Sequence, residues 1–302
     1  MTKVLVVMGG FSGEREISLL SGTEVSRALI KLGHEVVLYD LKNVGDFVAT
    51  LERVHPDVVF NALHGKYGED GCIQGLLNLM KIPYTHSGVL ASAIGMDKNK
   101  TKLIAQRVGV DIATGSLMTK EEFKMKEPPM PYVIKPNDDG SSLGVFIVKS
   151  DREKQMALDV WPDGESRLVE EYISGRELSV AVWKDKGVGV VEIVPKTGYY
   201  DFENKYSAGA AEHVVPALIP SEVYEKALEN AALVHRQLGC RGVSRSDFRF
   251  DEENQNRLVF LEINTNPGMT SLSLVPDIMR ACLGMSYERI VSGLVEEAAC
   301  DV

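Results

Sequence analysis

The chain is predicted to have an α/β fold, with a parallel α/β domain at the N-terminus and β-hairpins further along. An apolar run at residues 3–8, a glycine-rich turn, an amphipathic helical pattern at residues 14–32 and a second strand at residues 35–39 make a β-α-β unit. Two later segments alternate polar and apolar residues on either side of a polar turn, which is typical of hairpins. The more informative of the two covers residues 244–264 and carries most of the functional prediction.

Length and composition limit the classes of protein to which the chain can belong. Its 302 residues suggest two domains or three small ones, and 44% hydrophobic with 25% charged residues is ordinary for a globular protein. A formal charge of −10 argues against a nucleic-acid partner, which needs a basic face. The 4 cysteines include no CxxC pair, so we expect a reducing cytoplasm rather than structural zinc or disulfides. We expect no signal peptide, and no stretch reaches the ~20 apolar residues of a membrane span.

The first strand leads into a turn at residues 9–13 where a ligand is expected. Ligands on α/β sheets lie at the carboxyl ends of strands, over helix N-termini. The glycines of this turn lack the G-x-G-x-x-G spacing of a dinucleotide site, which counts against a nicotinamide-dependent dehydrogenase. Glu14 follows the turn, and an acid at a helix start suits the helix dipole. Glu14 can therefore either stabilise the helix N-terminus or bind a ligand, and the sequence position does not decide between the two roles.

A further buried strand, at residues 58–62, runs into a polar, glycine-rich loop at residues 64–71. His64 in this loop can be structural or functional. Residues 82–84 have the composition of a short strand. The first domain is expected to end near residues 92–96, because the composition then changes to a basic cluster.

The basic cluster opens a helix at residues 98–107. Lys100 and Lys102 are expected on its solvated face, because charged runs on helices usually face water. Lys98 is not assigned to the solvated face, because the hairpin that follows in the sequence carries a second lysine and a loop suited to phosphates.

The first of the two hairpins begins with the strand YVIKP at residues 132–136, which has Lys135 near its end. A loop rich in glycine and serine follows at residues 137–144, and residues 145–148 are the return strand. Such a tip can fold over phosphates and donate backbone N–H groups. It lacks the GK[ST] ending of a Walker loop.

A strand at residues 167–173 carries Glu170 and Glu171, and Glu177 follows. A carboxylate at a strand end can accept hydrogen bonds from ribose hydroxyls. The polar, aromatic loop at residues 198–209 has the character of an active-site loop. The other expected elements are strands at residues 178–183 and 189–193 and helices at residues 221–238, with Ser221 as N-cap, 275–283 and 287–299.

The hairpin at residues 244–264 places three oxygen-bearing side chains on one face. Residues i and i+2 of a strand share a face, so Asp247 lies with Arg245, and Glu262 lies with Asn264. The opposite faces are apolar and consist of Phe248, Phe250, Val259, Leu261 and Ile263. If these apolar faces pack on the core, the oxygen-bearing side chains become neighbours.

Two carboxylates and an amide oxygen on one rigid surface favour a hard cation, most plausibly Mg²⁺. Because Mg²⁺ takes one or two carboxylates plus phosphate oxygens, a nucleotide is expected to complete its coordination. The alternative is a solvated hairpin face. The metal site is preferred because residues 264–268, NTNPG, lead directly into a tight loop that can present backbone N–H groups to a ligand.

Taken in order, these motifs resemble those of the D-alanine–D-alanine ligases, members of the ATP-grasp superfamily, over essentially the whole chain. The motifs that carry the resemblance are Gly10-Phe11-Ser12-Gly13-Glu14, His64-Gly65 through Gly71, Met96-Asp97-Lys98, Lys135-Pro136 with Gly140-Ser141-Ser142 and Gly144, Tyr200-Asp201 with Lys205-Tyr206, Arg245 with Asp247, and Glu262 through Thr270.

The resemblance implies ATP held between two antiparallel sheets, with an N-terminal α/β domain at residues 1–95, a central domain at 96–178 and a C-terminal domain at 179–302. It implies that a first group of residues binds ATP: Lys98, Lys135, Gly140, Ser141, Ser142, Glu170, Glu171, Tyr172, Ile173, Glu177 and Lys205. Two Mg²⁺ ions, for which Mn²⁺ can substitute, are implied at Asp247, Glu262 and Asn264.

The resemblance also implies residues for the two amino-acid substrates. Glu14 is similar to the residue that holds the ammonium of the first D-alanine, with Ser141 and Tyr206 as its hydrogen-bonding partners and His64 lining the same site. Ser273 and Leu274 match positions that hold the carboxylate of the second substrate. Arg245 and the N–H of Gly268 are placed to stabilise an oxyanion.

The reaction implied is the ATP-dependent joining of two D-alanine molecules through an acyl phosphate, for peptidoglycan synthesis. Ligases that make D-alanyl-D-lactate or D-alanyl-D-serine resemble the chain as well and are the alternative. A non-catalytic ATP-binding protein on the same scaffold is disfavoured, because the acidic residues and Arg245 are all present. The resemblance also implies a homodimer, whereas the expectations of a cytoplasmic location and of no nucleic-acid or membrane partner come from the composition.

Overall fold

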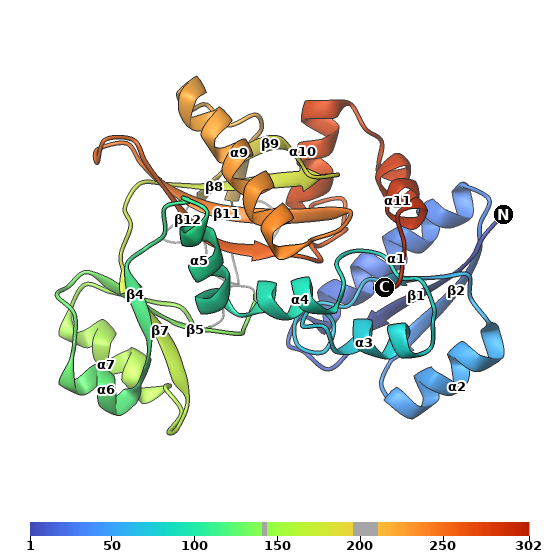
Figure 1. Ribbon diagram of the computed structural model, residues 1–302, viewed down its shortest axis with the longest axis horizontal. Coiled ribbons are helices and arrows are strands. Elements are labelled where there is room, and N and C mark those ends of the chain that lie inside the picture. The colour runs from blue at the N-terminus through green and yellow to red at the C-terminus, as the bar shows by residue number, and fades with distance from the viewer. Residues whose placement is uncertain (141–143, 196–210, 302) are drawn as a thin grey trace.

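The computed structural model describes residues 1–140, 144–195 and 211–301. Figure 1 shows three sheets along the length of the molecule, with the N-terminal sheet at one end, a four-stranded sheet at the other and a five-stranded sheet between and above them. The first sheet is parallel and the other two are antiparallel, which confirms the predicted α/β class with hairpins. No helix in the described part of the chain is long and apolar enough to cross a membrane.

The N-terminal sheet has the strand order β2-β1-β3. Its central strand is apolar on both faces: Leu5 and Val7 pack toward α2 and α3, whereas Val4 and Val6 pack toward α1 and α11. A strand covered on both sides is expected to be continuously apolar. The elements are β1 (Lys3–Gly9), α1 (Arg15–Lys31), β2 (Glu35–Leu41), α2 (Val44–Val54), β3 (Val58–Asn61), α3 (Cys72–Leu79) and α4 (Val89–Met96).

The four-stranded sheet has the order β4-β7-β5-β6, and two helices cover one of its faces. Phe123 of α6, Tyr132 of β5 and Trp161 after α7 form the centre of its small core. The elements, with the preceding helix, are α5 (Lys98–Arg107), β4 (Gly115–Thr119), α6 (Lys120–Met125), β5 (Tyr132–Pro136), β6 (Phe146–Val148), α7 (Asp151–Asp159) and β7 (Ser166–Glu171).

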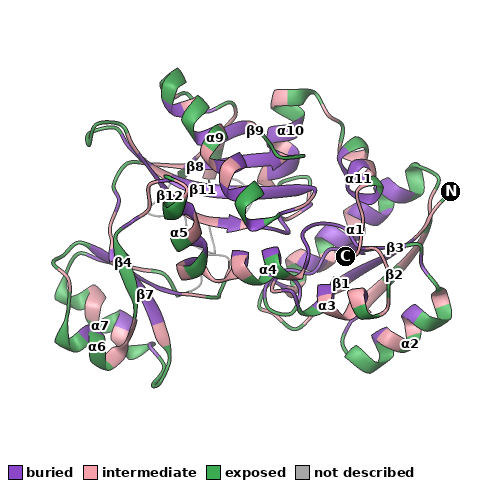
Figure 2. Ribbon diagram, in the orientation of Figure 1, coloured by how far each residue is buried: buried purple, intermediate pink, exposed green. Residues whose placement is uncertain are grey.

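The five-stranded sheet has the order β10-β9-β8-β11-β12 and is covered on both faces. On one face its side chains pack with α4, α5 and α9, and on the other with α10, α11 and the first sheet. Figure 2 accordingly shows its central strands as buried. The elements are β8 (Arg176–Trp183), β9 (Lys186–Pro195), β10 (Ala211–Val214), α9 (Ser221–Leu238), β11 (Val243–Asp251), β12 (Arg257–Asn264), α10 (Leu274–Leu283) and α11 (Tyr287–Glu296).

One apolar core joins the first sheet to the five-stranded sheet. It contains Val4 and Val6 of β1, Val243 of β11 and Met279 of α10, all buried. Shared apolar burial of this kind stabilises the relative placement of two domains. The N-terminal helix and the β11–β12 hairpin are therefore held together by packing, and the site lies between them.

Several predicted boundaries are wrong in informative ways. Ser221 is the first residue of α9 and Pro220 is the N-cap, because the carbonyl of Pro220 accepts the first helical hydrogen bonds, from the N–H groups of Val223 and Tyr224. The closing helix ends at Glu296, since Ala299 instead pairs with Tyr84. Residues 82–84 make only isolated bridges through Tyr84, rather than a strand. The predicted domain division at residues 178 and 179 stays a prediction, and both residues lie in β8.

A β-bulge corrects the prediction about the apolar face of the hairpin. Asp247 pairs with Glu262, but Phe248 pairs with Phe260, so Leu261 is an extra residue in β12. The bulge reverses the alternation of side chains along the strand. Before it, Phe260 faces the core beneath α9, and after it, Ile263 does.

The prediction that Val259, Leu261 and Ile263 share one face is therefore wrong. Val259 is buried on the other face, against Ala113 and Ile173, and Leu261 lines a cavity there. Without the extra residue, Glu262 would follow the alternation of Phe260 into the core. The bulge is what turns Glu262 to the same side as Asp247.

His86 gives a testable pH dependence of stability. It is 2% exposed and stands at a right angle to Phe60, with ring centroids 5.5 Å apart. Burial, with the charges of His64 and Arg241, lowers the pKa of His86 from 6.5 to about 3. The unfolded chain therefore binds the proton more readily, and stability is lost as pH falls from about 6.5 toward 3.

Between pH 7.5 and pH 4 we expect this histidine to contribute about 3 kcal/mol to acid destabilisation. Urea unfolding of the wild type and of His86→Gln between pH 7.5 and pH 4 will measure it. The variant should show a clearly weaker pH dependence. His55→Gln, which changes an exposed histidine at the end of α2, is the matched control. Parallel curves for the wild type and His86→Gln would contradict the assignment.

Candidate active site

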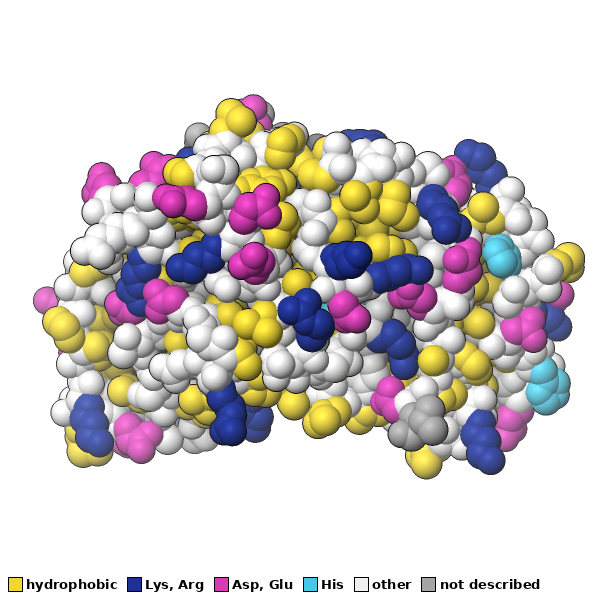
Figure 3. All heavy atoms as spheres, turned by 45° about the horizontal axis from the view of Figure 1, so that its top comes forward, with side chains coloured by type: hydrophobic (Ala, Val, Ile, Leu, Met, Phe, Trp, Pro, Cys, Tyr) yellow, Lys and Arg dark blue, Asp and Glu magenta, His cyan; other side chains and the backbone are white. Residues whose placement is uncertain are grey.

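Two adjoining cavities, each of 640–670 Å³, lie beside the β11–β12 hairpin. The sheet cavity lies between the four-stranded and five-stranded sheets. The domain cleft lies between the hairpin, α1 and the start of α10. The residues that line both are Lys98, Asp139, Gly140, Glu177, Ile193, Asp247 and Glu262. On the face of the molecule drawn in Figure 3, acidic and basic side chains are interspersed rather than gathered by sign.

The structure brings together the three oxygen-bearing residues of the hairpin. Asp247 lies directly across from Glu262, and Asn264 is across from Arg245. Asp247 is 7% exposed and is held by Ser179, whose Oγ donates to its Oδ1 at 2.5 Å, and by Arg245, whose Nε and Nη2 donate to its two oxygens at 2.9 and 2.8 Å. This orients the carboxylate in the cavity wall.

The donor set fits a divalent cation that also takes ligands from a phosphate. No cluster of three or more His, Cys, Asp or Glu residues suited to a metal is found among the described residues. Asp247 and Glu262 supply two carboxylates and Asn264 an amide, which is too few for an all-protein calcium site and suits Mg²⁺ with phosphate oxygens. Lys98 Nζ lies 3.3 Å from Glu262 Oε2, so a phosphate near the metal would also meet a lysine.

Lysines from two elements meet one glutamate in the sheet cavity. Lys135 Nζ, at the end of β5, lies 2.5 Å from Glu170 Oε1 on β7. The other oxygen of Glu170 is paired with Lys102 of α5. Burial opposes the charge of Glu170, but Lys135 and Lys102 outweigh it and lower its pKa. The prediction that Lys102 lies on a solvated face is wrong: Lys102 is 3% exposed.

The expected solvated position of Lys100 is correct, since it is exposed and pairs with Asp97 of the same helix. Lys98 and Lys102 are four residues apart, which puts both on one face of α5. From this spacing, the sequence could have predicted that Lys102 is on the same side of α5 as Lys98.

The far end of the sheet cavity has the residues predicted for a nucleoside. Residues 170–173, at the end of β7 and just after it, line this cavity together with the apolar side chains of Val133, Ile147 and Leu261. Glu171 turns its carboxylate outward, where it accepts hydrogen bonds from Thr114 N and Arg257 Nη2, both at 2.9 Å. This arrangement agrees with a contact through backbone rather than side chain.

Glu177 also lines the sheet cavity, as expected for a ribose partner. Its Oε2 lies 3.5 Å from Arg249 Nη1 on the neighbouring strand β11. Arg249 in turn donates from Nη2 to Gly175 O at 2.5 Å. The carboxylate is thus held at the edge of the cavity by an arginine that is itself fixed to the backbone.

Glu14 lines the domain cleft close to Asp139 and Gly140, which line it as well. Glu14 is 9% exposed. Among the described residues, its side chain makes no capping hydrogen bond to the N-terminus of α1. A Cβ placed on Gly140 would lie 3.1 Å from Glu14 Oε2, and one placed on Gly65 would lie 2.8 Å away. The two glycines therefore let two loops approach the carboxylate. This placement favours the functional role over simple complementation of the helix dipole.

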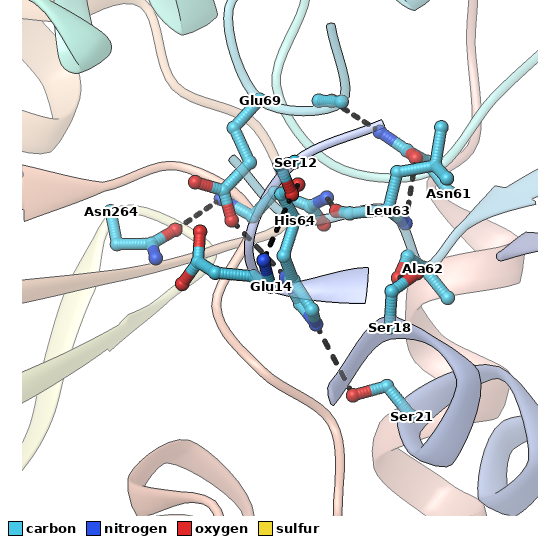
Figure 4. Close-up of polar contacts among 12 residues, drawn as sticks. Ser12, Glu14, Ser18, Ser21, Asn61, Ala62, Leu63, His64, Glu69 and Asn264 are labelled. Atoms are coloured by element: carbon cyan, nitrogen blue, oxygen red, sulfur yellow. Dashed lines mark hydrogen bonds and ion pairs between the residues drawn. The ribbon is translucent and has the colours of Figure 1, made fainter. Parts of the chain in front are cut away.

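His64 links the first domain to the loop after β12. Figure 4 shows its ring pointing toward Ser21 of α1, where Nε2 and Ser21 Oγ are 3.2 Å apart. Its Nδ1 lies 3.1 Å from Glu69 Oε1. Burial lowers the pKa of His64, but Glu69, together with Glu14 and the backbone of Asn266, more than compensates, so the pKa is raised. Ser21 Oγ also accepts from Met269 N at 3.4 Å, which connects the histidine to the loop at residues 264–270.

The opposite end of the domain cleft is the start of α10. Ser273 is the N-cap, and Leu274 is the first helical residue; both line the cleft, as does Gly268. Ser273 Oγ accepts from Thr270 N at 3.0 Å, and a Cβ on Gly268 would lie 3.0 Å from the same oxygen. A helix N-terminus with an adjacent hydroxyl suits a carboxylate.

Some predicted residues lie outside the described part of the chain: Ser141, Ser142, Lys205, Tyr206 and the rest of the loop at residues 198–209. Other residues were missed by the sequence analysis although they hold the site together. Ser179 is a polar residue in the otherwise apolar strand β8, and Glu69 lies five residues after His64 in the polar loop. Glu24 carried no signal, because its partner Ser271 is distant in sequence.

Comparison with known proteins identifies the family. A family model described as D-ala D-ala ligase C-terminus matches residues 104–296, and one described as D-ala D-ala ligase N-terminus matches residues 49–87. The chain belongs to the D-alanine–D-alanine ligase family. It is 47% identical to the D-alanine–D-alanine ligase of Paramagnetospirillum magneticum, over 99% of both chains, and 48% identical to D-alanine–D-alanine ligase B of Brucella suis, over 98% of both.

Solved structures of this ligase family have the same fold. The Bacillus anthracis D-alanine–D-alanine ligase superposes with a TM-score of 0.84 at 30% identity, covering 98% of this chain and 97% of that one. The structure of the same ligase complexed with ATP gives a TM-score of 0.82 at 29% identity, covering 98% and 96%. The predicted ATP-grasp fold and ligase class are thereby confirmed. The dehydrogenase alternative is ruled out by the family.

Proposed function

We propose that this chain joins two D-alanine molecules to D-alanyl-D-alanine and converts ATP to ADP and phosphate in the same reaction. The observation that carries the proposal is that the sheet cavity and the domain cleft meet at Asp247, Glu262 and Lys98. A nucleotide in the sheet cavity would place its terminal phosphate at this junction. A small amino acid in the cleft would lie on the other side of the same residues.

The first chemical step needs a carboxylate brought to a phosphate. A carboxylate is a poor acyl donor, because oxide would have to leave. An oxygen of the first D-alanine attacks the γ-phosphorus, the bond to the β-phosphate oxygen breaks, and ADP leaves with that electron pair. Lys98 and Lys135 stabilise the charge of the phosphoryl group during this transfer. Mg²⁺ held by Asp247, Glu262 and Asn264 would neutralise phosphate charge and align the reacting oxygens.

The second step forms the peptide bond. The neutral amine of the second D-alanine attacks the acyl carbon, the C–O bond to phosphate breaks, and inorganic phosphate leaves and takes up the proton that the nitrogen loses. Arg245 and the N–H of Gly268 line the cleft on one side and stabilise the tetrahedral oxyanion. The N-terminus of α10, with Ser273, receives the carboxylate of this second substrate. Glu14 receives the ammonium of the first.

The proposal is tested by phosphate release. The purified chain with ATP and Mg²⁺ should release phosphate only when D-alanine is added, and D-alanyl-D-alanine should accumulate in equal amount. Release that does not depend on D-alanine would overturn the proposal. D-Lactate and D-serine, added in competition, distinguish the related D-alanine–D-lactate and D-alanine–D-serine ligases, which no finding favours here.

The remaining parts of the proposal rest on the family. We propose that the enzyme acts as a cytoplasmic homodimer in the synthesis of peptidoglycan precursors, with two Mg²⁺ ions or Mn²⁺ in their place. Light scattering of the purified protein tests the dimer. Activity in Mg²⁺ and in Mn²⁺, after removal of metal by a chelator, tests the ions.

Glu24 gives a prediction about the second substrate. Its Oε2 accepts a hydrogen bond from Ser271 N at 2.6 Å, and its Oε1 is 3.4 Å from Ser271 Oγ. The carboxylate thus ties α1 to the loop that carries Ser273. Glu24→Ala should raise the KM for the second D-alanine about tenfold, because a charge-assisted hydrogen bond that positions the loop is lost. The KM for ATP should stay the same.

Initial rates against D-alanine concentration, fitted for two sites, give the measurement. Glu52→Ala, which removes an exposed glutamate of α2, is the control. Equal changes in the KM values for ATP and D-alanine would show a general disturbance rather than loss of loop positioning.

A further inference from the structure

We propose that Lys102 is a positioning residue for the nucleotide: it neutralises Glu170 from behind the sheet cavity and so leaves the charge of Lys135 available to phosphate. The inference rests on the proposed function, since it assumes that ATP occupies the sheet cavity. It concerns a residue that neither the sequence motifs nor the mechanism above uses.

The geometry separates the two lysines that share Glu170. Lys135 and Glu170 both line the sheet cavity, whereas Lys102 is not among the lining residues. Lys102 reaches Glu170 Oε2 from α5, and Lys135 reaches Oε1 from β5 at 2.5 Å. All three side chains are at most 8% exposed. A carboxylate on β7 is therefore fixed by a cation from each side.

The charges explain why both lysines are needed. Two lysines and one glutamate leave one net positive charge, and of these two lysines it is Lys135 that faces the cavity. Without Lys102, Lys135 and Glu170 would form a neutral pair, and Lys135 would attract phosphate much less strongly. In a buried site this attraction is much stronger than in water. Burial and the charge of Lys135 lower the pKa of Lys102 to about 8, against the opposing effect of Glu170, as expected where two cations share one anion.

Replacement of Lys102 separates this role from a structural one. Lys102→Met and Lys102→Gln should weaken ATP binding about 10- to 100-fold, while adenosine, which has no phosphate, should bind within about twofold of the wild type. Lys102→Arg should retain most of the ATP affinity. Lys100→Met, on the exposed side of the same helix, is the matched control and should bind both ligands as the wild type does.

Glu170 allows a test of charge rather than shape. The double variant Lys102→Met with Glu170→Gln again leaves one net positive charge at Lys135. The ratio of ATP to adenosine affinity should therefore be highest for Glu170→Gln, intermediate for the wild type and the double variant, and lowest for Lys102→Met. Calorimetric titration of the full-length chain with Mg²⁺ and each ligand gives the ratio.

The outcomes are distinct. A wild type that binds no ATP would overturn the proposed function itself. A wild type that binds ATP, with Lys102→Met or Lys102→Gln binding it equally well, would overturn the role of Lys102 alone. Equal loss of affinity for ATP and adenosine, or no recovery of the affinity ratio in the double variant, would show that Lys102 only supports the packing behind the cavity. Either result would also overturn the proposed role. If Lys102→Met fails to fold, Lys102→Gln and the double variant still decide between these outcomes.

Discussion

Glu262→Gln should lower turnover about 10³-fold, because it replaces a carboxylate that faces both Asp247 and Lys98 with a neutral amide of the same size. A metal ion at a transferring phosphoryl group stabilises the transition state by several kcal/mol, and 1.36 kcal/mol is a factor of ten in rate. The side chain is placed for this role by the bulge at Leu261 and by its pairing with Asp247. Its Oε2 also lies 3.3 Å from Lys98 Nζ.

The measurement is the rate of D-alanine-dependent phosphate release as a function of Mg²⁺ concentration. Glu262→Gln should need a much higher Mg²⁺ concentration and should not reach the wild-type rate. Glu253→Gln, in the exposed turn of the same hairpin, serves as the control. Wild-type turnover with an unchanged Mg²⁺ dependence would show that these hairpin residues do not hold the metal.

Arg245→Lys should lower kcat about 10²- to 10³-fold with little change in the KM for ATP. Loss of one oxyanion donor has this magnitude in other acyl-transfer enzymes. Lysine keeps the charge but not the planar fork. Arg245 donates to Asp247 Oδ1 from Nε and to Oδ2 from Nη2, at 2.9 and 2.8 Å, while it lines the domain cleft with Gly268. The ammonium of a lysine cannot hold both oxygens of Asp247 and also face the domain cleft.

Steady-state kinetics with ATP and D-alanine varied separately will test this. The control is Arg289→Lys. The guanidinium of Arg289 is exposed and pairs with Glu296 on α11, and Arg289 is not among the residues that line the cleft. A variant that keeps its kcat would remove Arg245 from the chemical step. A large rise in the KM for ATP alone would instead place its effect on the nucleotide through Asp247.

Local patterns predicted much of the fold. The apolar run of β1 and the glycine turn after it predicted a buried parallel strand followed by α1, and both are present. The alternation in residues 244–250 predicted that Phe248 and Phe250 face the core while Asp247 faces away, and they do. These predictions succeed because the side chains of a regular strand point to opposite faces from one residue to the next, which can be read from the segment itself.

The bulge shows where such patterns fail. Alternation alone would put Leu261 on one face with Val259 and Ile263, but one extra residue in β12 moves Ile263 to the opposite face. Whether a strand carries an extra residue depends on its pairing with another strand, which a single segment does not reveal. The prediction that Glu262 and Asp247 are neighbours was correct, although the argument about the apolar face behind it was partly wrong.

What the sequence by itself determined is the inventory: the motifs of the ligase family, the oxygen donors on β11 and β12, and the lysines near the glycine loop. What only the tertiary structure decided is which of them meet. The sequence suggested that Lys102 is a surface lysine, but in the structure its side chain is buried and paired with Glu170 of β7. Glu24 gained its role only when α1 was placed against the loop at Ser271. Contacts between residues far apart in the chain depend on how whole elements pack, and burial then decides which charges interact strongly.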